Sequence, residues 1–295
     1  MDKLTTIKIC RKRFDILKEG LRRCLNNFRA EQPHRHAFYY TSMLLTERVW
    51  TNEEMLNCLD EITVEMVQDS IPMLLSRIHI EALIYGNLNK KTALDLMNIV
   101  ECTLKKNVGS KYLMPSQLVR EREIQLSDGC HYVYEVINEI HSSSAVETYY
   151  QCGVQETRAN MLLELLAEII NEPCYNYLRT QEQLGYIVAS GARRSSGAQG
   201  LRIIVQSEKS PTFVDGRIES FIQYFDKHIQ ELTDEEFQNH VQSLTSLRLE
   251  KPKKLVVQCA KYWLEISSRQ YNFNRESIEV ACLATITKEE LYSFF

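Results

Sequence analysis

The chain has 295 residues, of which 44% are hydrophobic and 25% are charged, and its formal net charge at pH 7 is −4. This length is enough for about two domains with a hydrophobic core, and the balanced charge gives no argument for a nucleic-acid partner. No run approaches the ~18 consecutive apolar residues that a membrane span requires, and residues 1–14 lack the apolar region of a signal peptide.

The first part of the chain is predicted to be mainly helical. Apolar residues recur at helical spacing in segments 7–28, 37–49, 52–61, 64–77 and 93–104. Thr51 and Glu54 form a capping-box pattern at the start of one of these helices. Residues 79–85 alternate as a strand that ends at Gly86. Residues 107–121 have weak periodicity and one proline, so they are the best candidate for a linker between domains.

The second part mixes predicted strands and helices. Strand patterns occur at 122–127, 131–138, 144–151, 186–190 and 201–207. Helical patterns occur at 156–170, 174–183, 211–231, 234–249 and 255–270. A last helix is predicted to begin at the capping-box pattern formed by Thr287 and Glu290. The sequence therefore predicts an α+β fold, in which each domain has a mixed sheet packed against helices.

An internal repeat links the two parts. Residues 14–63 and 237–287 are nearly equal in length, and their landmarks match at an offset of 223–224 residues. Chance similarity between two helical segments is the alternative. If the repeat is real, the first copy lacks strands before its long helix, and the second lacks a counterpart of residues 78–106. The chain would then hold the back half of one domain and most of another.

The cysteines indicate a reducing compartment. There are nine of them, widely scattered and without a CxxC pair. An odd and scattered set argues against a disulfide framework, so a cytoplasmic location is expected. A peroxisomal or mitochondrial location stays open.

Residues 172–209 form the segment most suggestive of a binding site. Arg179 and Tyr186 lie seven residues apart, at the point where a helix gives way to glycine-containing, β-rich sequence. From spacing alone, a surface charge and a strand-end aromatic are the simpler reading. Gly185 is predicted to end the helix and to allow a close backbone approach.

Several segments together resemble the insulinase family of inverted-zincin peptidases. These segments are LNNFRAEQPHRHAFYY, LLSRIHIEALIYGNL, MPSQLVRERE, EPCYNYLRTQEQLGYIV, QGLRIIVQSEK, LEKPKKL and CAKYW…SRQYNF. The similarity extends over essentially the whole chain. It implies tandem insulinase-type domains, of which the first is N-terminally truncated (1–107) and the second C-terminally truncated (122–295), joined by a linker (108–121). In the family, four such domains form two bowl-shaped halves around a chamber.

The zinc motif of the family is absent from this chain. H-x-x-E-H on a helix places two zinc-ligating histidines on one face and a general base between them. The nearest approach begins at His228, but Leu232 stands where the second histidine must be. His34 and His36 are expected to form hydrogen bonds near Pro33 rather than to bind a metal. No zinc is therefore expected on this chain itself.

The resemblance implies roles for other residues. The counterparts of Arg179 and Tyr186 donate hydrogen bonds to the substrate backbone and to the oxyanion on the attacked carbonyl, with Gly185 beside them. The strand that follows Tyr186 is expected to pair with an extended peptide. His141 and Ser142–Ser144 are read as a polar turn, because a nucleophile elbow is missing.

Two further sites are implied by the resemblance. Cys174 matches a position linked to sensitivity to thiol reagents, although Ala167 replaces a second family cysteine and a buried, inert thiol is an equal alternative. A basic cluster matches a patch that binds ATP or other polyanions as modulators, and a solvated turn is its alternative. The cluster consists of Arg248, Lys251, Lys253 and Lys254.

By resemblance, this chain is the substrate-binding, zinc-lacking half of a metalloendopeptidase that degrades short peptides such as insulin-like hormones and amyloid-forming peptides. Its expected partners are peptide substrates and a zinc-bearing N-terminal half or a full-length paralogue, and a homodimer stays open. It is expected to be inactive alone. The alternative, favoured by Met1 and the missing zinc motif, is a stand-alone inactive homologue that binds peptides or pairs with a paralogue. A helical scaffold without a peptide function is a third reading.

Overall fold

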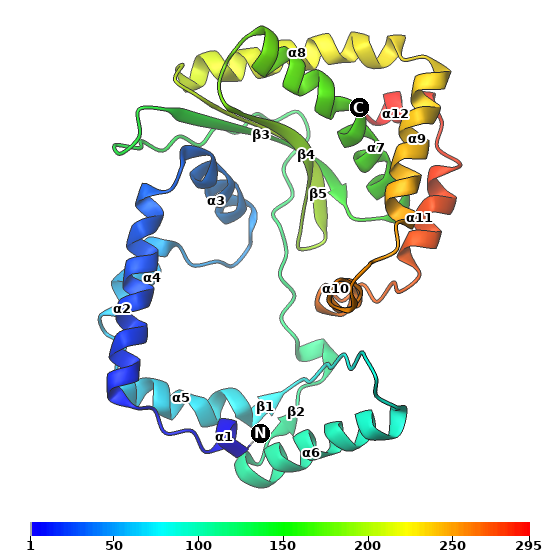
Figure 1. Ribbon diagram of the computed structural model, residues 1–295. Coiled ribbons are helices and arrows are strands. Elements are labelled where there is room, and N and C mark those ends of the chain that lie inside the picture. The colour runs from blue at the N-terminus through cyan, green and yellow to red at the C-terminus, as the bar shows by residue number, and fades with distance from the viewer. Residues whose placement is uncertain (1) are drawn as a thin grey trace. The chain divides into compact units, whose positions relative to one another are not determined.

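The computed structural model describes residues 2–295, which divide into two compact units (Figure 1). The first unit contains residues 2–28, 50–120 and 252–273, and the second contains residues 29–49, 121–251 and 274–295. The short 3-10 helix η1 (Phe28–Ala30) falls where the chain passes from the first unit to the second. The two units are interleaved along the chain and do not correspond to the ranges 1–107 and 122–295 as such. The domain boundaries predicted from the sequence therefore stay a prediction.

The first unit is built mainly from helices. Its elements are α1 (Asp2–Thr5), α2 (Arg11–Asn27), α4 (Asn52–Leu59), α5 (Val64–Ser76), β1 (Arg77–Ile78), α6 (Lys90–Val108), β2 (Lys111–Tyr112), the 3-10 helix η2 (Pro115–Gln117) and α10 (Leu255–Ser267). The capping box is confirmed: the Glu54 N–H donates to Thr51 Oγ1 at 3.1 Å, and the Thr51 N–H donates to the Glu54 carboxylate at 2.8 Å. The strand predicted at 79–85 is wrong, because β1 ends at Ile78, where its short parallel pairing with β2 also ends.

The packing of the first unit is open. α2 packs on α4, and the Lys18 ammonium group at this junction donates to the backbone carbonyls of Asp60 and Ile62 at 3.0 and 2.8 Å. Leu59 and Leu104 are buried. Large apolar side chains nevertheless stay exposed on α2, α5, α6 and α10, among them Leu17, Leu21, Met73, Leu94 and Leu264. The apolar stripes that predicted these helices are therefore only partly covered.

The second unit combines an antiparallel sheet with helices. Its elements are α3 (Pro33–Leu45), β3 (Ser144–Val154), α7 (Thr157–Cys174), the π-helix η3 (Tyr175–Gln181), β4 (Ile187–Ser195), β5 (Ala198–Ser207), α8 (Pro211–Glu231), α9 (Asp234–Leu249), α11 (Arg275–Leu283) and α12 (Lys288–Phe294). The strand order is β3–β5–β4. The strands predicted at 122–127 and 131–138 are wrong: the first makes an isolated bridge between Glu123 and Thr46, and the second is irregular.

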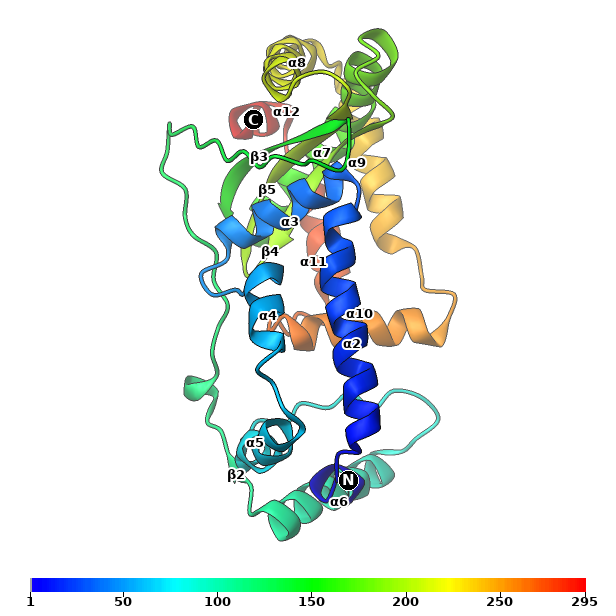
Figure 2. The ribbon, with the colours of Figure 1, turned by 90° about the vertical axis from the view of Figure 1, so that its left-hand side faces the viewer.

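The two faces of this sheet have different environments. Leu201, Ile203 and Val205 of β5 belong to the buried core, which also contains the apolar side chains of α7 and the inner side of α8. The alternate residues point to the other face. There the Arg202 guanidinium lies 4.4 Å from the ring centroid of Phe38 in α3, and the side-chain oxygen Oε1 of Gln206 lies 2.8 Å from His34 Nδ1. The sheet thus separates α7 from α3 (Figure 2).

The predicted repeat is confirmed at the level of helices. α2, α3, α4 and α5 begin at residues 11, 33, 52 and 64, and α9, α10, α11 and α12 begin at residues 234, 255, 275 and 288. Each helix of the second set therefore begins 222 to 224 residues after its counterpart. The N-caps also correspond, because Thr63 and Thr287 each accept a hydrogen bond from the backbone N–H three residues further on.

Within residues 2–295, no helix combines the length and apolar character that crossing a membrane requires.

Candidate functional site

The helix that leads into the predicted site changes its geometry just before Arg179. Pro173 lies inside α7 and cannot donate the backbone N–H that an α-helical turn uses. The chain then continues as the π-helix η3 over the region where the sequence predicted an ordinary helix. Single π-helical turns occur often at functional sites. Arg179 lies within η3.

Arg179 and Tyr186 are in direct contact. Arg179 Nη1 donates a hydrogen bond to the backbone carbonyl of Tyr186. The guanidinium also lies over two tyrosine rings, 4.5 Å from the centroid of Tyr186 and 5.1 Å from that of Tyr175. The side chain of Tyr186 is 82% exposed. The structure thus joins an oriented cation and an exposed phenol on one surface, both of them hydrogen-bond donors.

The turn before Tyr186 requires glycine. A Cβ on Gly185 would lie 1.9 Å from the carbonyl oxygen of Gln206, which belongs to the backbone of β5. The close backbone approach expected at Gly185 is therefore confirmed, whereas the prediction that the helix ends at Gly185 is wrong, because η3 already ends at Gln181. Ser207 Oγ donates to the Leu184 carbonyl at 2.5 Å and fixes the same turn to β5.

Tyr186 directly precedes a strand at the edge of the sheet. In the described part of the chain, β4 pairs with β5 on one side and is the outermost strand on the other. The outer side of an edge strand presents backbone N–H and C=O groups that another extended chain can use. The two donors and this edge adjoin in sequence and in space.

Cys174 is buried at the end of α7 and is 0% exposed. Burial raises the pKa of its thiol to about 11, and a hydrogen bond with Ser190 opposes this only in part. A reactive cysteine needs the thiolate form and access to solvent. The geometry therefore favours the inert alternative for this residue.

The predicted basic cluster is not uniform. Arg248, at the end of α9, is paired with the carboxylates of Glu164 on α7 and Glu279 on α11. Lys251, in the second unit, and Lys253 and Lys254, in the first, are exposed. The environment of Arg248 is that of an internal ion pair, whereas the lysines reach solvent.

The histidines have local roles. His34 shares a hydrogen bond with Gln206, His141 Nε2 lies 3.1 Å from the Ala30 carbonyl, and His228 stacks on Tyr224. Among residues 2–295, His, Cys, Asp and Glu side chains form no group of three or more that could hold a metal ion. The residues that the structure describes therefore do not fit a zinc site.

One side chain of the site, that of Arg217, escaped the sequence reasoning. Arg217 of α8 binds the carboxylate of Glu182, which lies in the turn between η3 and Gly185. Glu182 belongs to the segment that the sequence singled out, but Arg217 lies 35 residues away and has no local signal.

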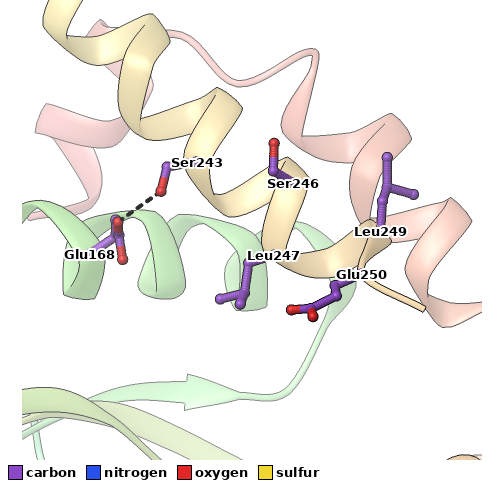
Figure 3. Close-up of a pocket in the computed structure, with 6 residues that line it drawn as sticks. All are labelled: Glu168, Ser243, Ser246, Leu247, Leu249 and Glu250. Atoms are coloured by element: carbon purple, nitrogen blue, oxygen red, sulfur yellow. Dashed lines mark hydrogen bonds between the residues drawn. The ribbon is translucent and has the colours of Figure 1, made fainter. Parts of the chain in front are cut away.

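A separate hollow lies between α7 and α9 (Figure 3). Ser243 Oγ donates to Glu168 Oε1 at 3.2 Å within it, and the remaining lining comes from Ser246, Leu247, Leu249 and Glu250. It offers an acidic and partly apolar surface without a nucleophile–base pair, so it is not the better candidate.

Comparison with known proteins gives matches along the whole chain. Residues 1–58 match the model of the middle or third domain of peptidase M16, and residues 165–263 match the model of the C-terminal lobe domain 4 of PQQ synthase PqqF-like proteins. The chain is 53% identical to the insulin-degrading enzyme of Bos taurus and 41% identical to that of Drosophila melanogaster, in each case over 100% of this chain. It spans 29% and 30% of these relatives, respectively.

A solved structure shows the same fold. The crystal structure of pitrilysin matches with a TM-score of 0.86 over 98% of this chain and 30% of that one, at 20% identity. At this identity the likeness concerns the fold alone.

Proposed function

The chain belongs to the M16 peptidase family, and from this membership we propose that it forms the substrate-binding, zinc-lacking part of an insulin-degrading-enzyme-like metalloendopeptidase. Its substrates are short peptides, including insulin-like hormones and amyloid-forming peptides. The observation that carries the proposal is the contact between Arg179 and the exposed Tyr186 at the start of β4.

The chemistry of this pair suits the recognition of a peptide at the bond that is cleaved. Arg is permanently charged and Tyr is a rigid neutral donor, so together they stabilise a carbonyl on which negative charge develops. Removing one donor of this kind typically costs about 2.7–4 kcal/mol in the transition state. The adjoining edge of β4 adds main-chain hydrogen bonds to an extended substrate, which tolerates many side-chain sequences.

The proposal includes a partner that supplies the zinc site, since this chain offers no metal-binding group among residues 2–295. The repeat supports an incomplete first domain. In the second unit, α9, α11 and α12 all pack on α7. Their counterparts α2, α4 and α5 leave Leu21, Met55 and Met66 exposed. A zinc-bearing N-terminal half with a helix equivalent to α7 would cover these residues.

Polyanion binding belongs to the same proposal. Lys251, Lys253 and Lys254 are the groups that would attract ATP or another phosphate. Arg248 contributes less, because Glu164 and Glu279 already neutralise it.

The experiment is reconstitution of peptide cleavage. The purified chain is mixed with zinc and a quenched peptide substrate, alone and with the part of the Bos taurus insulin-degrading enzyme that precedes the segment matched here. We expect cleavage in the mixture only. Tyr186→Phe should then lower kcat about 10²-fold with unchanged thermal stability, because it removes one donor from an exposed position.

Other outcomes would contradict the proposal. Equal turnover by the Tyr186→Phe mixture would remove this residue from the reaction. Peptide binding by the chain without any cleavage in the mixture would favour the stand-alone, inactive homologue instead.

A further inference from the structure

The turn between η3 and β4 has to hold Arg179 and Tyr186 in one arrangement, and its core packing comes from Leu184, which is 5% exposed. Gln183 is exposed and adopts a left-handed backbone conformation, with φ of 52°. Tyr186 is almost fully exposed, so its ring is not held by a core. A left-handed non-glycine residue is strained and persists when surrounding contacts fix it. The exposed residues of the turn therefore depend on contacts with other elements, in addition to the anchoring of Leu184 in the core.

Arg217 provides such a contact from α8. Its Nε donates to Glu182 Oε2 at 2.7 Å, and its Nη2 donates to Glu182 Oε1. This bidentate geometry fixes both the position and the orientation of a carboxylate. Both side chains are partly shielded from solvent. Glu182 immediately precedes the strained Gln183, so the pair acts on the turn where its conformation is decided.

A second hydrogen bond extends this contact to the π-helix. Arg217 Nη2 lies 3.1 Å from the hydroxyl of Tyr177, which is part of η3. The Tyr177 ring packs on Phe221 and Tyr224 of α8, with centroid distances of 5.7 and 5.1 Å. One guanidinium thus connects η3, which carries Arg179, with the turn that leads to Tyr186.

The backbone of the turn is hydrogen-bonded to η3. The Glu182 N–H donates to the Tyr177 carbonyl and the Leu184 N–H donates to the Leu178 carbonyl, each at 3.1 Å. On the α8 side, the neighbours of Arg217 include Ile218 and Phe221, both fully buried. Arg217 is therefore anchored to the rigid core of the second unit, while the groups that it holds lie at the surface.

We propose that Arg217, through its bidentate pair with Glu182, is a positioning residue that holds Arg179 and Tyr186 in the arrangement in which both can reach one peptide. The inference rests on the proposed function for the identity of the ligand. It assigns to α8 a role in the site that neither its sequence nor its distance along the chain indicates.

The first test measures local opening of the turn by hydrogen exchange and uses the chain alone. Arg217→Met should accelerate amide hydrogen exchange of residues 182–187 by about tenfold or more. Without the bidentate pair, local opening of the turn costs less free energy and therefore occurs more often. Arg158→Met is the matched control, since Arg158 makes an equivalent bidentate pair with Glu290 elsewhere in the second unit. The exchanged pair Arg217→Glu with Glu182→Arg should restore protection. Unchanged exchange in Arg217→Met would overturn the proposal.

The second test asks whether the positioning serves the site. In the reconstituted mixture, Arg217→Met should lower kcat roughly 10²-fold with a smaller change in KM, as expected for a misplaced reacting group. Tyr186→Phe should then cost much less in the Arg217→Met background than in the wild type. If the two changes reduce kcat independently, so that their effects on the activation free energy add, the proposal is overturned even where Tyr186→Phe alone lowers kcat. A silent Tyr186→Phe would instead contradict the proposed function, and the exchange test still decides the role of Arg217.

Discussion

At the scale of residues, the site is defined by one charged group that has several contacts at once. The Arg179 guanidinium contacts the rings of Tyr175 and Tyr186 and donates to the Tyr186 backbone carbonyl. A planar guanidinium can stack and donate at the same time, which an ammonium group cannot do as well. Gly185 makes the arrangement possible, because any Cβ there would collide with β5. The donors are thus ordered before a ligand arrives, which lowers the cost of binding.

Cys174 leads to a prediction about thiol chemistry. With a pKa of about 11, roughly one thiol in a thousand is ionised at pH 8, and burial also blocks access. We expect iodoacetamide at pH 8 to alkylate the exposed Cys10, Cys24 and Cys58 in the folded chain and to leave Cys174 unmodified. Peptide mapping by mass spectrometry measures each site, with the urea-unfolded chain as the control in which Cys174 reacts. Alkylation of Cys174 at the rate of Cys10 would show that the helix end opens readily.

At the scale of elements, helices were predictable from the sequence and several strands were not. α2, α5, α6 and α8 carry clear apolar stripes, and the residues around Tyr186 gave the β4–β5 hairpin. Residues 131–138 have the alternating pattern of a strand but pair with no strand in the described part of the chain. Alternation reports a preference for a sheet, whereas a strand exists only where a partner supplies its hydrogen bonds.

The candidate site was predictable only in part for a related reason. Arg179, Gly185 and Tyr186 lie within one short segment, so a local pattern could identify them. Arg217 reaches the same turn from α8 through tertiary packing, which a local pattern does not contain. The helix α11 was not predicted from its own sequence, although the repeat makes it the counterpart of α4. Its weak stripe includes the buried Glu279, whose burial depends on partners from another helix.

That buried carboxylate supports a prediction about how α9 and α11 are held together. Glu279 is 2% exposed and lies between Arg248 of α9, at 3.1 Å, and Arg275 of its own helix, at 3.4 Å. Removing one member of a buried ion pair leaves charges without compensation. Glu279→Ala should therefore lower the free energy of unfolding by about 3 kcal/mol in urea titrations. Asp234→Asn, at the exposed pair with Lys288, should cost less than about 1 kcal/mol. Equal effects of the two changes would mean that the network around Glu279 contributes only as a surface pair.

At the scale of the whole molecule, the repeat and the compact units divide the chain differently. α3 belongs to the first copy of the repeat but to the second unit, whereas its counterpart α10 belongs to the second copy and to the first unit. The first unit therefore contains one helix of the second copy, α10, and the second unit contains one helix of the first copy, α3. Such a reciprocal exchange makes the folding of the two copies interdependent, so a clean cut between two independent domains is not expected.

The same correspondence predicts which apolar surface is built for association. Leu244 of α9 is 5% exposed in the core of the second unit, whereas Leu21, which lies 223 residues earlier on α2, is 49% exposed. An aspartate at position 244 would be buried, so Leu244→Asp should unfold the second unit. An aspartate at position 21 meets solvent in the isolated chain, so Leu21→Asp should leave its thermal unfolding unchanged.

The effect of Leu21→Asp should appear only on association. If α2 is covered by a helix of the zinc-bearing half in the way that α7 covers α9, the change places a charge in that interface and should weaken binding by at least about 10²-fold. Isothermal titration with the preceding part of the Bos taurus relative measures this affinity. Leu247→Asp is the control, because Leu247 is an exposed leucine of α9, at the rim of the hollow between α7 and α9, and does not belong to α2. Undiminished binding by Leu21→Asp would place the interface on another surface of the first unit, since a buried aspartate without a partner could not be tolerated there.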